Sequence, residues 1–295
     1  MIQESTSTGL QEREPAKPYS IKRMIVAHDG SQAAGKALND AVSLARRFGS
    51  EVILAHVQSP GENDMTDEGA SLRHERSEAQ SDVSQLTNRL LSGGIRSRGI
   101  VRAGSVGDIL FNLCCEEEAD LLLMGAYGHG TQDRQTLGST AEQLLRAVSC
   151  PVLTYGPNAS SPVISAQHLG PALLPVSLPC PLNYLAEATK LAKLFGCGVE
   201  LFHAVDGVGH PPIEWLEREC QQIASFLRQN GVRTQWSFMY GQADRTICSK
   251  SREIDSPFIL MPLKWRKGLS AITSDNVAAR VIRQATVPVL SYRCD

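Results

Sequence analysis

The amino-acid sequence repeats itself, and this repeat constrains the fold more than any other feature. The segment Ser43–Gly49 aligns with Lys190–Gly196, and at the same interval His56 falls on His203. Three further pairs share one constant interval: Gly104 with Gly241, Met124 with Met261, and Pro151 with Pro288. A repeat of this length predicts two copies of one structural unit, joined by the Pro-, Ser- and Gly-rich segment 157–170.

Each copy alternates strand and helix signals. In the first copy we expect strands at 22–28, 51–57, 96–102, 120–124 and 150–155, and helices at 33–48, 68–91, 105–118 and 138–148. Gly49 is expected to end the first of these helices. Alternation of this kind predicts an α/β fold, with a parallel sheet and right-handed crossovers in each copy.

The composition narrows the class of protein. The chain has 295 residues, of which 42% are hydrophobic and 20% charged, as in soluble globular proteins. A net charge of -2 and an aromatic content of 5% argue against a nucleic-acid partner. No apolar run is long enough to span a bilayer, so no membrane partner is expected. Residues 1–20 are polar and predict a disordered arm rather than a signal peptide, which favours the cytoplasm.

The eight cysteines are scattered and include no C-x-x-C pair. This distribution is typical of buried thiols in a reducing compartment, and it offers no spacing for a metal site.

The stretch 119–151 carries the strongest functional signal. A buried strand, a glycine-punctuated loop and a helix that opens at Gly138-Ser139-Thr140 follow one another. A helix N-terminus after such a loop binds phosphate in many α/β proteins, because its first N–H groups have no partner within the helix. Glycine and Ser/Thr also mark ordinary loops and helix caps, so this pattern alone leaves both interpretations open.

The full spacing, Gly125-x2-Gly128-x9-Gly138-Ser139-Thr140, resembles the nucleotide-binding signature of the universal stress protein family. The first strand, which ends at Asp29, and the second, which ends in His56-Val57, are also similar to that family. The resemblance implies two tandem Rossmann-like domains at 21–156 and 171–295. It further implies five parallel strands in each domain, in the order 3-2-1-4-5, with helices on both faces. The last strands of the two domains would then associate in an intrachain pseudo-dimer, and the resemblance also allows a homodimer.

The resemblance further implies that the first domain binds ATP, with or without magnesium. Asp29 and Val57 would contact the adenosine. Gly125, Gly128 and Gly138 would hold the phosphates together with the hydroxyl residues Ser139 and Thr140. Four neighbours complete the expected site: Ala27, Met124, His129 and Gly130.

The second copy departs from this signature. Aligned by the repeat, Asp29 becomes Ser177, Gly125 becomes Pro262, Gly128 becomes Trp265, Gly138 becomes Asp275 and Ser139 becomes Asn276. Proline has no N–H to donate, tryptophan fills space, and aspartate repels phosphate. We therefore expect one ATP per chain, in the first half.

Three functions fit these observations. One is an ATP-binding stress-response protein whose nucleotide state alters its contacts with unidentified protein partners. Another is a slow ATP-hydrolysing enzyme, and a third is a scaffold with a vestigial site. The sequence lacks a P-loop and an acidic cluster for metal-assisted hydrolysis, and His28 and His129 are weak candidates for a general base. The intact signature favours binding without efficient turnover, and we name no catalytic residue.

Overall fold

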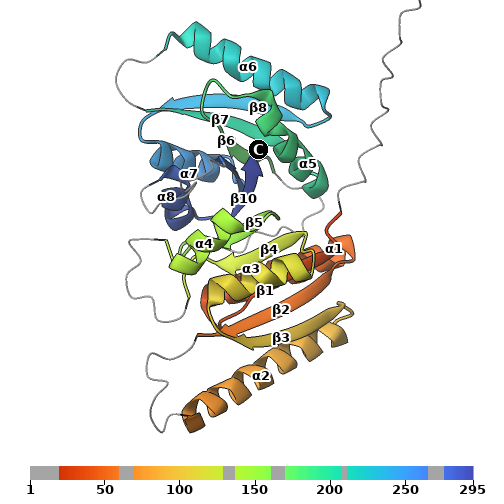
Figure 1. Ribbon diagram of the computed structural model, residues 1–295. Helices are drawn as coiled ribbons and strands as arrows, with labels where there is room; N and C mark the ends of the chain where they lie inside the picture. The colour runs from red at the N-terminus through yellow and green to blue at the C-terminus, as the bar shows by residue number, and fades with distance from the viewer. Residues whose placement is uncertain are drawn as a thin grey trace, which may run out of the picture.

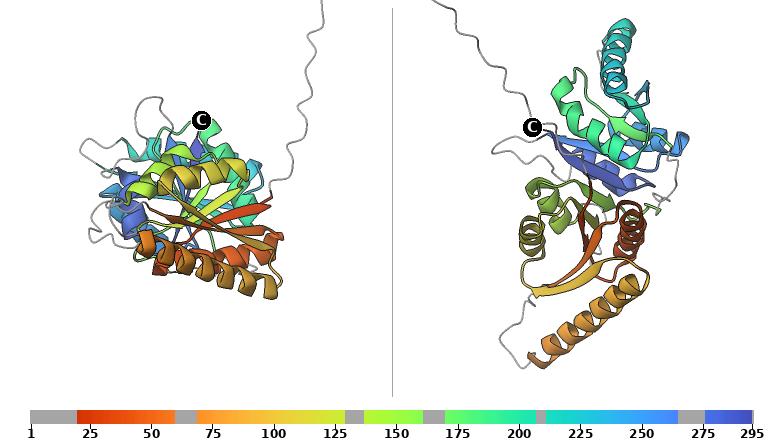
Figure 2. Two further views of the ribbon diagram at one scale, coloured as in Figure 1. Left: turned by 60° about the horizontal axis from the view of Figure 1, so that its bottom comes forward. Right: turned by 90° about the vertical axis from the view of Figure 1, so that its right-hand side faces the viewer.

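The computed structural model describes residues 20–59, 69–128, 137–160, 170–206, 211–264 and 276–294. They form a ten-stranded sheet with helices on both of its faces (Figures 1 and 2). The predicted N-terminal arm, except for Ser20, lies outside the described residues, as does most of the predicted linker.

The first half of the sheet contains strands β1–β5. Its elements are β1 (Arg23–Ala27), α1 (Gln32–Phe48), β2 (Glu51–Gln58), α2 (Gly69–Ser92), β3 (Ser97–Ala103), α3 (Val106–Glu116), β4 (Leu121–Gly125), α4 (Ser139–Ala147) and β5 (Val152–Tyr155). These bounds agree with the predicted elements to within about two residues at most ends.

The second half contains strands β6–β10. Its elements are β6 (Ala172–Pro175), the 3-10 helix η1 (Leu182–Tyr184), α5 (Leu185–Phe195), β7 (Val199–Val205), α6 (Ile213–Gln229), β8 (Thr234–Tyr240), α7 (Ala243–Glu253), β9 (Ile259–Lys264), α8 (Val277–Gln284) and β10 (Val289–Cys294).

The strand order confirms the predicted topology of each half. The sheet runs β3-β2-β1-β4-β5-β10-β9-β6-β7-β8. Read from either edge toward the middle of the sheet, each half has the strand order 3-2-1-4-5. The pairs within each half are parallel, whereas β5 and β10 pair antiparallel, with Leu153 opposite Leu290. The last strands of the two halves therefore join them into one continuous sheet, and Figure 1 shows these strands at the middle of the molecule.

Two hydrophobic cores lie on the two faces of the sheet, and both cores extend through both halves. One core contains buried residues of α1, α2, α5 and α6, and the other contains those of α3, α4, α7 and α8. The helix ends follow from local sequence. Ser31 caps α1 through its hydroxyl, and Gly49 ends α1 at a φ of 67°, as predicted. Gly196 ends α5 in the same way, at a φ of 63°.

Side chains outside the sheet also connect the halves. The rings of Phe48 and Phe195 meet edge to face at 6.1 Å, and the Arg47 guanidinium donates to the Phe195 carbonyl at 2.7 Å. Ser160, within the predicted linker, donates to the Thr286 carbonyl at 3.0 Å. The start of that linker is therefore attached to the second half. No helix in the described residues is both long and apolar enough to cross a membrane.

Candidate functional site

The candidate site lies at the point in the first half of the sheet where the strand order reverses. Strand β1 has β2 on one side and β4 on the other, so the crossovers leaving β1 and β4 run to opposite sides. Such a switch point opens a crevice at the carboxyl ends of the strands, which is where open α/β sheets bind ligands. Asp29 follows β1 there, and Gly125 ends β4.

A cavity of about 470 Å³ occupies this crevice. It brings together every predicted site residue that the structure describes: Ala27, Asp29, Val57, Met124, Gly125, Gly128, Gly138, Ser139 and Thr140. The two other predicted residues, His129 and Gly130, lie outside the described residues. Segments that are far apart in the sequence thus share one cavity.

Asp29 is held at the start of α1. One oxygen of its carboxylate accepts a hydrogen bond from the Ser31 N–H at 2.9 Å, and Ser31 in turn accepts from the Ala34 N–H at 3.2 Å. This hydrogen bond gives Asp29 a structural role at the helix start. It is compatible with a ligand role, because the same carboxylate also lines the cavity.

Two glycines of the signature lie close to other parts of the chain, and for Gly138 the packing itself requires glycine. A Cβ on Gly128 would lie 3.2 Å from Oδ2 of Asp29, and one on Gly138 would lie 2.7 Å from the Ala126 carbonyl oxygen. The Gly138 N–H donates to that same carbonyl at 3.1 Å. The close approach at Gly138 is therefore between two parts of the chain.

The N-terminus of α4 faces the cavity. Gly138 is its N-cap and supplies no side chain, while Ser139 and Thr140, the first two helical residues, line the cavity. In the described part of the chain no side chain caps this helix. Its first N–H groups and the positive end of its dipole are thus available to an anion.

The other end of the cavity is apolar and includes residues that the sequence analysis missed. Val106 and Leu110, both on α3, line it beside Val57 and Met124. The available signal was Gly104, which recurs as Gly241 in the second copy and marks the turn that carries α3 over the strand ends. One end therefore suits an apolar ring, and the opposite end suits an anion.

The histidines at the strand ends have matching structural contacts. Nδ1 of His56 lies 2.9 Å from the His28 carbonyl oxygen, and Nδ1 of His203 lies 2.9 Å from the Val176 carbonyl oxygen. The same contact occurs in both halves, as expected for a role in joining neighbouring strands. Within the described residues, no group of three or more His, Cys, Asp or Glu side chains is arranged to hold a metal ion.

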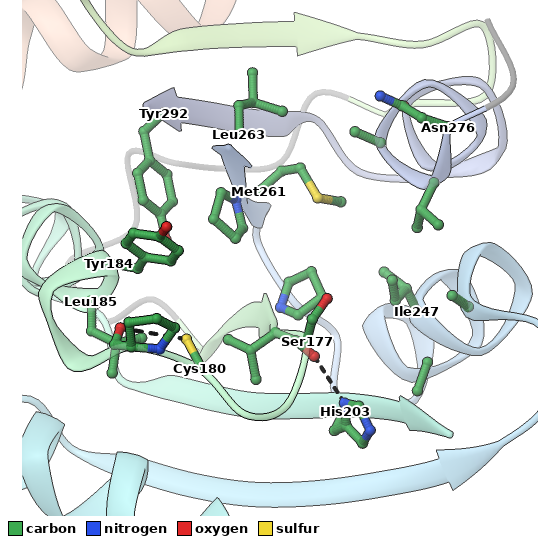
Figure 3. A pocket seen from close by; sticks show the side chains of 18 residues that line it. Ser177, Cys180, Tyr184, Leu185, His203, Ile247, Met261, Leu263, Asn276 and Tyr292 are labelled. Atoms are coloured by element: carbon green, nitrogen blue, oxygen red, sulfur yellow. Dashed lines mark hydrogen bonds between the residues drawn. The ribbon is translucent and has the colours of Figure 1, made fainter. Parts of the chain in front are cut away.

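The second half has a cavity at the equivalent place, with a volume of about 310 Å³ (Figure 3). Ser177 lines it in place of Asp29, and Pro262, a residue of β9, lines it in place of Gly125. The counterparts of Gly128 and Gly138, Trp265 and Asp275, lie outside the described residues. Whatever these two contribute, the switch point of the second half is still hollow.

The helix that faces this second cavity is capped by its own sequence. Asn276 is the N-cap of α8, and its side chain accepts from the Ala279 N–H at 2.9 Å. The alignment had matched Asn276 with Ser139, the first residue of α4, so α8 begins one residue later than the repeat predicts. An N–H group left for a ligand in α4 is therefore bonded within the chain in α8.

Comparisons with known proteins agree with this architecture. The model of the Universal stress protein family matches residues 20–155. The chain is 26% identical over 139 residues to Universal stress protein MJ0531 of Methanocaldococcus jannaschii, covering 45% of this chain and 80% of that protein. It is 28% identical over 139 residues to a universal stress protein of Thermus aquaticus, covering 45% and 97%. A solved universal stress protein from Archaeoglobus fulgidus, 17% identical, covers 92% of this chain and 98% of its own with a TM-score of 0.72, a likeness of fold along both halves.

Proposed function

Because the chain belongs to the universal stress protein family through residues 20–155, we propose that its first half binds one ATP as a cytoplasmic regulator of the stress response. The nucleotide would alter contacts with protein partners. The observation that carries this proposal is the single cavity at the β1–β4 switch point, which contains all the described residues of the nucleotide signature.

The two ends of the cavity would bind different parts of ATP. Val57, Met124 and Leu110 offer an apolar surface for the adenine ring, and the nearby Asp29 carboxylate can accept from a ribose hydroxyl. The uncapped N-terminus of α4 can donate to the phosphates through the N–H groups and hydroxyls of Ser139 and Thr140. The ligand would span the cavity between these ends.

The described residues of the second cavity provide neither the carboxylate nor the uncapped helix start of the first, which is why we propose one ATP per chain. Ser177 provides no carboxylate, Pro262 has no N–H, and Asn276 already bonds to the first turn of α8. A phosphate in the second cavity would therefore find fewer donors than in the first.

A matched pair of proline variants tests this assignment. Ser139 and Val277 are the first residues of α4 and α8, where proline is well tolerated because its missing N–H has no partner in the helix. The preceding residues, Gly138 (φ -58°, ψ 139°) and Asn276 (φ -79°, ψ 161°), have the extended backbone that proline requires before it. Each variant thus removes one N–H at a helix start while the helix is retained.

We expect calorimetric titration of the nucleotide-free full chain with ATP to report one site. Ser139→Pro should weaken that site roughly 10- to 100-fold, because a hydrogen bond to a charged group contributes about 1.5–3 kcal/mol. Val277→Pro should leave the ATP affinity unchanged. Ser139→Ala removes the hydroxyl but keeps the N–H, so it distinguishes the contributions of these two groups. Two equivalent sites, no binding, or equal effects of the two prolines in folded protein would each contradict the proposal.

A further inference from the structure

The second cavity differs from the first in the chemistry of its wall. Its described lining includes aliphatic and thioether side chains such as Ile247, Met261, Leu263 and Val277, and contains no Asp, Glu, Lys or Arg (Figure 3). Burying apolar surface drives the binding of apolar ligands, whereas a charged ligand would lose hydration here without an opposite charge among these residues. The wall therefore favours an uncharged, mainly apolar ligand.

One buried polar group in this wall has no hydrogen-bond partner among the described residues. Tyr292 on β10 is 2% exposed and lines the cavity, and no described group hydrogen-bonds to its hydroxyl. Figure 3 shows its ring extending from β10 toward Tyr184, which also lines the cavity. Buried hydroxyls nearly always have a hydrogen-bond partner, so this one needs an explanation.

The equivalent tyrosine of the first half shows what has changed. Tyr155 is as far from Pro151 as Tyr292 is from Pro288, and its hydroxyl donates to Oδ2 of Asp40 on α1 at 2.5 Å. Counting back from the matching helix ends Phe48 and Phe195, the residue opposite Asp40 is Glu187.

Glu187 does not take over the role of Asp40. Its carboxylate instead pairs with Lys190 at 3.1 Å, near the surface of α5. Among the described residues, the second half therefore keeps the tyrosine without an acceptor for its hydroxyl. Burial raises the pKa of Tyr292 well above its ordinary value, so the phenol is a neutral donor at physiological pH.

We propose that the second cavity binds an uncharged, mainly apolar small molecule whose oxygen accepts a hydrogen bond from Tyr292. The ligand's acceptor replaces the carboxylate that Asp40 supplies in the first half. The apolar remainder packs against Ile247, Met261 and Leu263. The two cavities share no lining residue, so this ligand and ATP would occupy separate sites.

A pair of probes tests the hydrogen bond. 2-Acetylnaphthalene carries one carbonyl acceptor, and 2-ethylnaphthalene has a similar shape without it. We expect fluorescence titration of the full chain to show roughly 5- to 10-fold tighter binding of the ketone, as for one neutral hydrogen bond. Tyr292→Phe should abolish this preference and leave hydrocarbon binding unchanged, while Tyr155→Phe should preserve it.

A second pair of variants identifies the cavity. Ala278 lines the second cavity, and Ala141, its counterpart in the repeat, lines the first. Ala278→Leu should exclude the ketone while ATP titration is unchanged, and Ala141→Leu should leave ketone binding intact. The proposal is overturned if neither probe binds, if the ketone has no advantage over the hydrocarbon, or if Ala141→Leu rather than Ala278→Leu removes binding. Failure of ATP binding alone would contradict only the function proposed for the first half.

Discussion

The two switch-point cavities have the same place in the fold and opposite chemistry. The first contains the Asp29 carboxylate and an α4 N-terminus without a described side-chain cap. In the second, Ser177 replaces the carboxylate, Asn276 caps the helix, and the wall includes a tyrosine whose hydroxyl has no described partner. The comparison teaches that a repeated fold preserves the switch-point cavity, because the strand order creates it. A few side chains at strand ends and helix starts then decide what the cavity can hold.

The largest expected effect is on the free energy of unfolding, and it compares the contributions of the two halves to the core. Phe48 and Phe195 end equivalent helices, but Phe195 is 1% exposed and also contacts Phe258 at 5.0 Å, whereas Phe48 is only partly buried. We expect Phe195→Ala to lower the free energy of unfolding by about 3–5 kcal/mol, as large-to-small changes in cores do. Phe48→Ala should lower the free energy of unfolding by clearly less. Urea denaturation measures both, and equal losses would contradict the asymmetry.

The next effect concerns the equivalent tyrosines. Tyr155→Phe removes the donor to Asp40, a carboxylate that is 2% exposed, and should cost about 1.5–3 kcal/mol of unfolding free energy. Tyr292→Phe removes a hydroxyl without a described partner, so it should leave the unfolding free energy of ligand-free protein unchanged or raise it. Denaturation of the two variants side by side checks this. A larger loss for Tyr292→Phe would mean that its hydroxyl is bonded within the protein.

The smallest effect concerns the strand-end histidines. His56→Ala and His203→Ala each remove one hydrogen bond to a backbone carbonyl. Each should therefore lower the free energy of unfolding by about 1 kcal/mol, with similar losses in the two halves. Any slow ATP turnover should be unaffected by His56→Ala. Loss of a general base slows reactions by about 10²–10⁴-fold. A decrease of that size in a steady-state phosphate-release assay would assign His56 a catalytic role.

Local sequence patterns predicted much of the fold. The repeat, the alternation of elements and Gly49 at the end of α1 depend on residues close together in the chain, whose periodicity and backbone preferences act locally. The strand order and the grouping of Asp29, Val57 and the glycine signature came from the family resemblance, and the structure has the same order and brings these residues to one cavity.

By itself, then, the sequence determined that the chain contains two α/β units and that the signature is complete in one of them. Only the tertiary structure decided the register in which β5 meets β10, the reason that Gly138 must be glycine, and the partners of the two tyrosines. Tyr155 and Asp40 are 115 positions apart in the chain. Whether two such groups meet depends on how helices pack on the sheet, since no local preference of either residue encodes the contact.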